Sequence, residues 1–364
     1  EMCIRDRNIG NGSYSTADSY VKQVWDGRYT GIRMCNQLLE NIDRVPDLDP
    51  ELKKRYIGEA KVLRAYSYYE LYTKFGDIPY TTKVLSIKES MSIARTAKAT
   101  VIANVLADLD EVINGNYLPT SYDADNKGRI TRWAAMAIKA KIYLFEGNWT
   151  QVKNITSTIM TEGGFKLFGS YAGLFEIANE YNSEVILDAQ YRPTSREHQM
   201  MYVFLPPTLG GYSQLSPLQE LVDSYIMLDG KTIKETGTSF DESHPYANRD
   251  PRLKATVMYT GNSYTLADGT EVVINCEKGE GKDGYGVGSD CSATGYYIKK
   301  YWDNTYRATL YSGLNPILIR YADILLMNAE ALAELGELDK TAWDATIKPI
   351  RDRAGFTLAS ALEF

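Results

Sequence analysis

The side chains best suited to molecular recognition are aromatic residues in loops, with polar residues close by in the sequence. The chain has 28 Tyr, 9 Phe and 5 Trp. A tyrosine presents an apolar ring face and a hydroxyl together, so it can stack on a flat molecule and hydrogen-bond to it. The candidate ligand-binding residues, chosen because they fall outside helical stripes, are Tyr14, Tyr202, Tyr212, Trp302, Asp303, Asn304, Tyr306, Arg307 and Tyr311. Packing within the protein is the alternative role for each.

Patterns for catalysis and metal binding are largely missing. The only histidines are His198 and His244, so neither a histidine-rich metal site nor an HExxH zinc helix can form. Counting leaves a Ser-His-Asp arrangement open, but the GxSxG pattern that presents a nucleophilic serine is not found. Paired carboxylates for glycoside cleavage cannot be chosen among 47 acidic residues. We therefore predict no catalytic residues, no metal site and no cofactor.

Two loops resemble known binding motifs only superficially. Residues 279–284 fit GxGxxG, but the glycine-rich stretch after them cannot open a helix, so no helix dipole would face a pyrophosphate. Residues 123–128 resemble the start of a calcium loop, yet Lys127 stands where an oxygen ligand is required and Ala134 replaces the bidentate acid. We reject both sites and interpret the second segment as a capping loop.

The cysteines leave one alternative open. Cys35 falls on an apolar helical stripe and is interpreted as a small core residue. Cys276 and Cys291 bracket a glycine-rich loop, and a disulfide closing it would contribute about 3 kcal/mol. Such a bond would fit an oxidising compartment. Two free thiols are the alternative.

Composition and charge exclude several classes of protein. The formal net charge is −7 and the pI is about 5.2, which argues against a nucleic-acid binder because such a protein needs a basic face. No stretch approaches the roughly 18 apolar residues of a membrane span. A chain of 364 residues can bury a large core, as one big domain or two ordinary ones.

Helical periodicity organises the first half of the chain and its end. Residues 18–45 carry an apolar stripe, prolines at 46 and 50 end it, and residues 51–75 form the partner helix through Ile57, Ala60, Leu63, Ser67 and Leu71. So short a turn requires antiparallel packing. Residues 100–113 and 131–146 form a second predicted pair, with Thr131 as N-cap. Residues 318–335 and 341–353 form a third. Aromatic residues on these stripes, namely Trp25, Tyr66, Tyr68, Tyr69 and Tyr72, are assigned to packing.

An internal sequence repeat indicates a repeat architecture that is interrupted by a long insert. Residues 140–149 align with 329–338, and in both a small residue lies seven positions before a glycine that ends one helix and lets the next turn back. That is the logic of a tetratricopeptide hairpin. Residues 163–315, rich in Gly, Tyr, Asn, Asp and Pro with short β-like runs at 184–190 and 270–275, interrupt the hairpins. We predict a mainly α fold of tetratricopeptide-like helical hairpins with a large loop-rich insert containing short β-strands.

Both ends of the chain are interpreted as unnatural. Residues 1–7 resemble the translation of a transposase adapter used in sequencing libraries, so they are left out of fold reasoning. We expect residues 8–364 to form a single domain, with a helical scaffold at about 18–162 and 316–354 and a ligand-binding insert at about 163–315. The chain is expected to be a fragment truncated at both ends.

Several motifs along the chain resemble the RagB/SusD family of outer-membrane nutrient-uptake lipoproteins of Bacteroidetes. The helical segments 63–80 and 318–336 carry this resemblance most clearly. It extends through residues 25–39, 59–66, 74–79, 128–131, 147–149 and 248–253, and includes Arg95. Within these motifs, Arg64, Arg320 and Asp323 are interpreted as buried ion-pair or capping residues rather than ligand contacts.

The resemblance implies a function that the residues alone do not give. It implies a cell-surface protein that binds polysaccharide or oligosaccharide and delivers it to a SusC-like TonB-dependent transporter, over which it acts as a lid. It also implies a lipid anchor in the outer membrane, which this fragment lacks. Peptide is an alternative ligand. A helical-repeat protein–protein adaptor, with a groove free of clustered aromatics, is the alternative function, and a glycoside hydrolase is a third.

Overall fold

The computed structural model describes residues 13, 15–305 and 309–364, which form two compact units. Of the described residues, the helical unit comprises 15–165 and 323–337, and the mixed unit comprises 13, 166–305, 309–322 and 338–364. Three of the predicted ligand residues, Tyr14, Tyr306 and Arg307, lie outside the described residues, as do residues 1–7. The boundary between the units that follows α7 falls at 165/166, three residues beyond the expected end of the first part of the helical scaffold.

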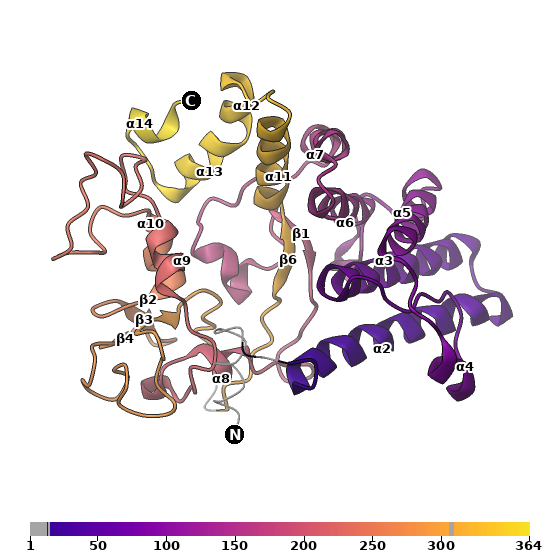
Figure 1. Ribbon diagram of the computed structural model, residues 1–364, viewed down its shortest axis with the longest axis horizontal. Helices are drawn as coiled ribbons and strands as arrows, with labels where there is room; N and C mark the ends of the chain where they lie inside the picture. The colour runs from indigo at the N-terminus through magenta and orange to yellow at the C-terminus, as the bar shows by residue number, and fades with distance from the viewer. Residues whose placement is uncertain (1–12, 14, 306–308) are drawn as a thin grey trace. The chain divides into compact units, whose positions relative to one another are not determined.

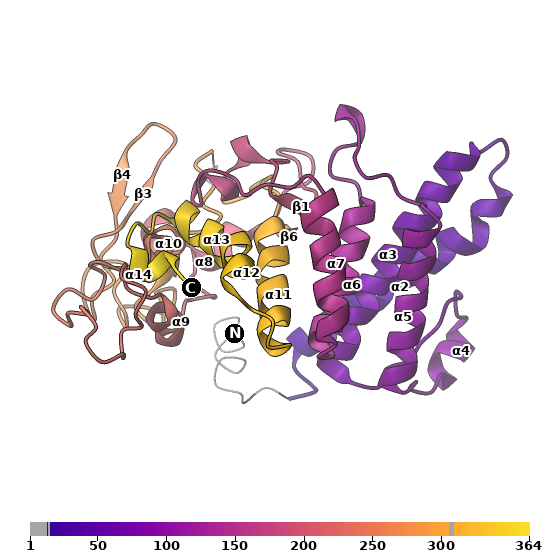
Figure 2. The same ribbon diagram turned by 90° about the horizontal axis from the view of Figure 1, so that it is seen from above.

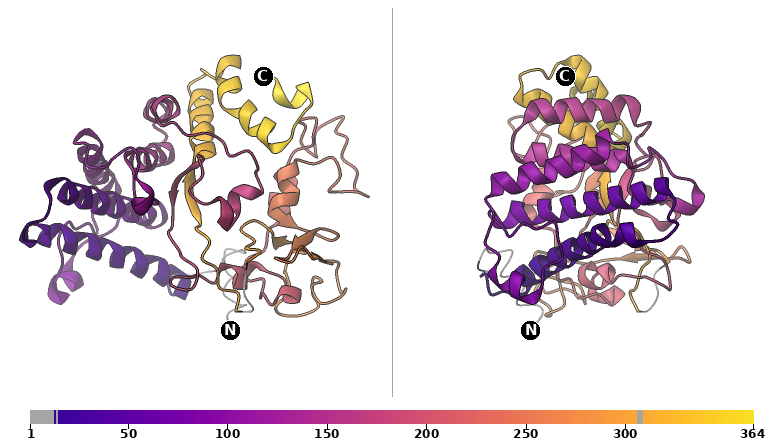
Figure 3. Two further views of the ribbon diagram at one scale, coloured as in Figure 1. Left: turned by 180° about the vertical axis from the view of Figure 1, so that it is seen from behind. Right: turned by 90° about the vertical axis from the view of Figure 1, so that its right-hand side faces the viewer.

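The helical unit is a row of antiparallel helices. In it, α2 packs on α3, α3 on α5, α5 on α6 and α6 on α7 (Figures 1 and 3). Its helices are α2 (Ser19–Asn41), α3 (Pro50–Phe75), α4 (Ile87–Ser92), α5 (Lys98–Asn114), α6 (Arg132–Phe145), α7 (Trp149–Glu162) and most of α11 (Tyr321–Glu334). Two 3₁₀ turns, η1 (Ile42–Arg44) and η2 (Ala124–Asn126), lie between them. This is the predicted architecture of helical hairpins.

The helix boundaries follow from local chemistry. The Asp49 side chain accepts a hydrogen bond from the Leu52 amide (2.8 Å), and Pro50 occupies the first turn of α3. Thr131 caps α6 as predicted, because its hydroxyl accepts a hydrogen bond from the Ala134 amide (3.2 Å). The two glycines of the internal sequence repeat, Gly147 and Gly336, have φ of +70° and +68°. A side chain with a Cβ rarely adopts this backbone geometry, so each glycine lets the chain turn back after its helix.

The predicted stripe on α3 is correct at Ala60, Ser67 and Leu71, whereas Ile57 is only half-buried. Leu63 is 48% exposed, so its predicted burial is wrong. The buried series instead runs through Ala60, Arg64, Ser67 and Leu71, at helical spacing. Arg64 takes the buried place because its guanidinium is paired with groups on the neighbouring helices. Tyr68 and Tyr72 are almost fully buried, as predicted for packing residues.

The third predicted helical pair is wrong in two details. The first helix starts at Tyr321 rather than at residue 318, because Ile317–Arg320 forms strand β6 and pairs antiparallel with β1 (Val185–Asp188). The second is divided into α12 (Lys340–Ala345) and α13 (Ile347–Ala354), because Thr346 leaves helical geometry with φ −121° and ψ −69°. In the helical unit, α11 is joined to α7, since Asn328 Nδ2 donates a hydrogen bond to Thr156 Oγ1 (2.9 Å).

The mixed unit contains three two-stranded antiparallel sheets among short helices (Figures 1 and 2). Besides β1 and β6, the strand pairs are β2 (Val257–Met258) with β5 (Tyr297–Ile298), and β3 (Ser263–Thr265) with β4 (Glu271–Val273). Its remaining helices are α8 (Met200–Phe204), α9 (Gln219–Ser224), α10 (Pro251–Thr256), α12, α13 and α14 (Ala359–Leu362), with 3₁₀ turns η3 (Gly173–Phe175), η4 (Ile177–Asn179) and η5 (Pro207–Leu209). Both predicted β-like runs contain a strand, β1 and β4.

An apolar core ties these small elements together. Tyr264 and Tyr297 are fully buried in it, with Met258, Ile274 and Phe204 around them. Such a core can hold loops rigid without long strands. The fold is therefore mainly α with short β-strands, as predicted. Over the described residues, we find no helix that combines the length and apolar character needed to cross a membrane.

Candidate functional site

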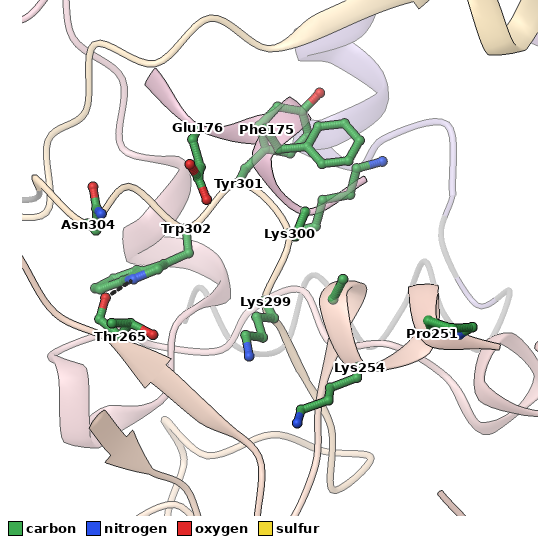
Figure 4. A pocket seen from close by; sticks show the side chains of 12 residues that line it. Phe175, Glu176, Pro251, Lys254, Thr265, Lys299, Lys300, Tyr301, Trp302 and Asn304 are labelled. Atoms are coloured by element: carbon green, nitrogen blue, oxygen red, sulfur yellow. Dashed lines mark hydrogen bonds between the residues drawn. The ribbon is translucent and has the colours of Figure 1, made fainter. Parts of the chain in front are cut away.

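A hollow of about 390 Å³ lies within the mixed unit, where the ends of several short elements meet. Figure 4 shows its side chains. They come from η3 and the residues beside it, from α10, from the end of β3, and from the segment after β5. The lining residues are Ala172, Phe175, Glu176, Pro251, Lys254, Ala255, Thr265, Lys299, Lys300, Tyr301, Trp302 and Asn304.

Two consecutive aromatic residues, Tyr301 and Trp302, are held by main-chain partners. The indole Nε1 of Trp302 donates a hydrogen bond to the Thr265 carbonyl (2.8 Å), as Figure 4 shows, and the Trp302 ring packs edge-on against Tyr264 with centroids 5.2 Å apart. The Tyr301 hydroxyl accepts a hydrogen bond from the Ile317 amide (3.0 Å). Both rings are half-buried, so each keeps part of its surface exposed in the hollow. Their orientation is fixed before any ligand arrives.

A third ring and a lysine complete one wall. The Phe175 ring lies 5.0 Å from the Tyr301 ring, centroid to centroid, with the two planes at 60°. Lys300 places its Nζ 4.0 Å above the centroid of Phe175, in a cation–π contact. This contact holds the ammonium at the wall while the ring faces remain apolar.

Two further lysines line the hollow. Lys254 is exposed on α10, and Lys299 is half-buried and donates a hydrogen bond from Nζ to Asn262 Oδ1 (3.0 Å). Burial, and then the nearby Lys254 ammonium, lower the pKa of Lys299 below its ordinary value of 10.5, while Glu271 acts against this. The two ammonium groups are therefore close enough to repel each other.

Polar groups lie beside the rings. Asn304 is exposed in the lining and offers an amide that both donates and accepts hydrogen bonds. The one carboxylate of the lining belongs to Glu176, which is also exposed. In Figure 4, Glu176 and Asn304 lie at the end of the hollow that holds Trp302.

The structure brings two of the predicted ligand residues, Trp302 and Asn304, into this hollow. Asp303, which lies between them in sequence, points elsewhere and is only 3% exposed. Its carboxylate accepts hydrogen bonds from the Ser312 hydroxyl and from the Thr305 amide (2.9 Å). Asp303 therefore holds the turn that presents its two neighbours.

The other described candidates lie outside the lining. Tyr202 and Tyr212 face each other with ring centroids 4.3 Å apart, and the hydroxyl of Tyr212 raises the pKa of Tyr202 above its ordinary value. The Tyr212 amide donates a hydrogen bond to the Tyr202 carbonyl (2.9 Å). Tyr311 is 40% exposed. Tyr202 and Tyr212 form a second aromatic surface of the mixed unit, separate from the residues that line the hollow.

Sequence reasoning missed most of the hollow. Phe175, Glu176, Lys254 and Thr265 come from segments as much as 90 residues apart, and no motif marks them. A signal did exist for the others, because Lys299, Lys300 and Tyr301 directly precede Trp302 in the sequence. Two lysines followed by two aromatic residues in a loop would have been a reasonable prediction of a site.

The described cysteines are all free thiols. Cys276 is buried, which raises the pKa of its thiol to about 12, and the Cys291 thiol donates a hydrogen bond to the Lys282 carbonyl (3.2 Å). The sequence leaves open either a disulfide or two free thiols for Cys276 and Cys291, and the structure has two free thiols.

This arrangement can bind a flat, partly polar molecule. Fixed ring faces, an amide and three ammonium groups offer stacking, hydrogen bonds and charge. The single carboxylate of the lining differs from the carboxylate pair of glycoside hydrolysis. Within the described ranges, no cluster of three or more His, Cys, Asp or Glu side chains suits a metal ion.

A second hollow, of about 530 Å³, lies in the helical unit beside Arg55, Tyr117 and Arg132. It is larger but has a single aromatic ring in its lining, that of Tyr117. A pocket for a ring-shaped ligand needs apolar faces as well as space. The hollow of the mixed unit is therefore the stronger candidate.

Comparisons with known proteins agree along most of the chain. The family model described as "SusD family" matches residues 174–362, and one described as "Starch-binding associating with outer membrane" matches residues 5–144. The SusD-like protein P25 of Formosa agariphila is 32% identical over 46% of this chain and 31% of that protein. The SusD-like protein P38 of the same organism is 25% identical over 91% of this chain and 63% of that protein. The chain thus spans less than two thirds of either relative.

Solved structures give the same result. A SusD-like carbohydrate-binding protein from Bacteroides fragilis is 25% identical, with a TM-score of 0.83 over 94% of this chain and 67% of that one. A further SusD-like protein from Bacteroides fragilis is 27% identical, with a TM-score of 0.78 over 94% of this chain and 69% of that one.

Proposed function

Because the chain belongs to the SusD family, we propose that it binds glycans in the hollow of the mixed unit. The observation that carries the proposal is the fixed pair Tyr301 and Trp302, with the Asn304 amide beside it. A sugar ring has apolar C–H faces that stack on aromatic rings, and hydroxyls that pair with amides. The related structure described as carbohydrate-binding supports the same ligand class.

We further propose a place for this binding step in nutrient uptake. The protein acts at the surface of the outer membrane, held there by a lipid anchor, and delivers its glycan to a SusC-like TonB-dependent transporter. The description of the model that matches residues 5–144 supports the association with the outer membrane. The alternative function, a protein–protein adaptor, predicts a groove without clustered aromatic residues. Three aromatic rings line this hollow, which favours glycan binding over the adaptor.

Calorimetric titration with a panel of polysaccharides and peptides tests the binding step. We expect heat from at least one glycan and none from the peptides. Trp302→Ala should weaken that binding about tenfold or more, since a central Trp commonly carries 2 kcal/mol or more of binding energy. Trp302→Phe, which keeps a ring face, should lose less. Tyr285→Ala is the control, because Tyr285 is 42% exposed and lies outside the lining.

The outcomes separate the alternatives. Heat from peptides alone would overturn glycan as the ligand, and equal losses for Trp302→Ala and Tyr285→Ala would overturn the hollow as the site. Delivery to a transporter is tested by affinity purification of the full-length natural protein from its native outer membrane. A TonB-dependent barrel should co-purify in stoichiometric amount. Recovery of soluble partners alone would favour the adaptor.

A further inference from the structure

We propose that the hollow selects anionic glycans, whose sugars carry carboxylate or sulfate groups, and that Lys254 and Lys299 are the residues that determine this specificity. The inference rests on the proposed glycan binding and adds the chemical class of the glycan. It comes from the charges that surround the rings, which a site for neutral sugars does not need.

Cations outnumber anions around the hollow. Among the described lining residues, three are lysines, at positions 254, 299 and 300, and one is an acid, Glu176. Lys300 lies against the face of Phe175, so its ammonium is committed to the wall. Lys254 and Lys299 stand together at the other side of the hollow, as Figure 4 shows. They are the groups that a bound ligand would meet beyond the rings.

These two ammonium groups are kept close at a cost. Lys299 is half-buried, and its ammonium donates a hydrogen bond to the neutral amide of Asn262 (3.0 Å) rather than forming an ion pair with a carboxylate of the described residues. Glu271 on β4 offsets this charge in part, but its carboxylate already accepts hydrogen bonds from the hydroxyls of Ser263 and Thr265. A bound anion would relieve the repulsion between two neighbouring ammonium groups, and charge-assisted hydrogen bonds would hold it.

The local excess of positive charge in the hollow contrasts with the negative charge of the protein as a whole. The chain has a formal net charge of −7, so its surface as a whole repels a polyanion. At about 0.1 M salt, charges more than about 10 Å away are largely screened. An anionic sugar seated in the hollow would therefore experience mainly the nearby lysines. Neutral glycans would gain hydrogen bonds from them but no charge attraction.

The test compares glycans that differ only in charge. One pair is polygalacturonate and its methyl-esterified, uncharged form; the other is a sulfated galactan and the same polymer after desulfation. The two pairs also distinguish a carboxylate from a sulfate as the recognised group. We expect the anionic member of at least one pair to bind about tenfold or more tightly than its uncharged counterpart, with affinity that falls as salt rises.

Charge variants at Lys254 locate the selectivity. Lys254 is exposed and close to the end of a short helix, so its replacement should not disturb folding. Lys254→Gln should weaken anionic binding about fivefold to tenfold, and Lys254→Glu should weaken it further, while binding of the uncharged forms falls less in both variants. Lys278→Gln is the matched control, because it removes the same charge from an exposed lysine outside the lining.

Each outcome has one meaning. Tighter anionic binding that is lost with Lys254→Gln but kept with Lys278→Gln supports the inference. Equal affinity for both members of each pair, or equal loss with the two lysine variants, overturns it while leaving glycan binding intact. Absence of binding by any glycan, charged or neutral, overturns the proposed function itself. Thermal unfolding of each variant confirms that a loss of affinity reflects the site.

Discussion

Arg64, which is buried, and Asp108, which is half-buried, form an ion pair that joins two helices of the helical unit. The Nε and Nη2 atoms of Arg64 on α3 both donate to Asp108 Oδ2 on α5, at 3.1 and 2.6 Å. The remaining Nη1 donates to Asn36 Oδ1 on α2 (2.9 Å), and Asn36 is itself fully buried. One guanidinium therefore connects three helices, which confirms the interpretation of Arg64 as a buried ion-pair residue.

Arg64→Ala should destabilise the helical unit by about 3 kcal/mol, because Asn36 loses its buried donor and Asp108 keeps only its weaker pair with Lys61 (3.7 Å). Urea unfolding followed by circular dichroism measures the change. Lys53→Ala is the control, since Lys53 pairs with Asp43 on the surface, and such pairs contribute about 1 kcal/mol or less. Similar losses for the two variants would contradict the importance of burial here.

Glu184 has a comparable role in the mixed unit. Its carboxylate is fully buried and accepts hydrogen bonds from Arg320 Nη1 (2.9 Å), Arg353 Nη1 (2.8 Å) and the Phe168 amide (2.7 Å). Glu184→Ala leaves two guanidinium groups without their shared anion, so we expect a loss of about 3–5 kcal/mol of unfolding free energy. Asp241→Ala, at an exposed acid paired with His244, should cost about 1 kcal/mol or less.

Gly211 sits where no side chain fits. A Cβ there would lie 2.1 Å from the Leu205 carbonyl oxygen, which belongs to the backbone and cannot move aside as a flexible side chain could. Gly211→Ala should therefore destabilise the mixed unit by about 1–3 kcal/mol and disturb the adjacent contact of Tyr212 with Tyr202. Thermal unfolding measures the loss. Gly169→Ala, where open space surrounds the added methyl, should leave the midpoint within about 1 °C, consistent with surface changes under 0.5 kcal/mol.

Glu180 should make the mixed unit less stable as the pH rises. Burial raises the pKa of its carboxyl above the ordinary 4.5, and the neighbouring carboxylates of Asp188 and Asp303 raise it further, against a hydrogen bond from the Asn315 amide. The folded state thus holds the proton more tightly than the unfolded state, so this group favours folding at low pH and opposes it once the pH exceeds the folded pKa.

Glu180→Gln isolates this effect. The Gln amide oxygen can still accept from Asn315, and the charge is removed. The variant should match the natural protein near pH 4 and gain stability over it as the pH rises above 4.5 towards 7. Urea unfolding at both pH values provides the comparison. A difference between the two proteins that is the same at both pH values would contradict the raised pKa.

Most of the helical unit could be predicted because its signal is local. The stripe of Ile32, Cys35 and Ile42 repeats at helical spacing, and Thr131 marks a helix start by its own side chain. Strand β6 could not be predicted in this way. The apolar pattern of its residues predicts the start of a helix, and only pairing with Val185–Asp188, about 130 positions earlier, makes them a strand. Periodicity carries no information about so distant a partner.

The candidate site was predictable in part for the same reason. Trp302 and Asn304 stand out as loop residues, but Asp303 between them has the same loop character and turns inward to Ser312. Which of three consecutive residues faces the hollow depends on backbone geometry that composition does not encode. Lys254 and Phe175 are ordinary helix and turn residues until the fold brings them beside Trp302.

The anchoring of Tyr301 and Trp302 has a consequence for how such a site changes over evolutionary time. Both rings are tied to backbone atoms, the Ile317 amide and the Thr265 carbonyl. Any residue except proline supplies the first atom, and every residue supplies the second. Mutations at 265 and 317 can therefore accumulate without releasing the two rings. Descendant proteins can replace the lysines around the hollow, and so change the ligand, while they inherit the same pair of fixed aromatic rings.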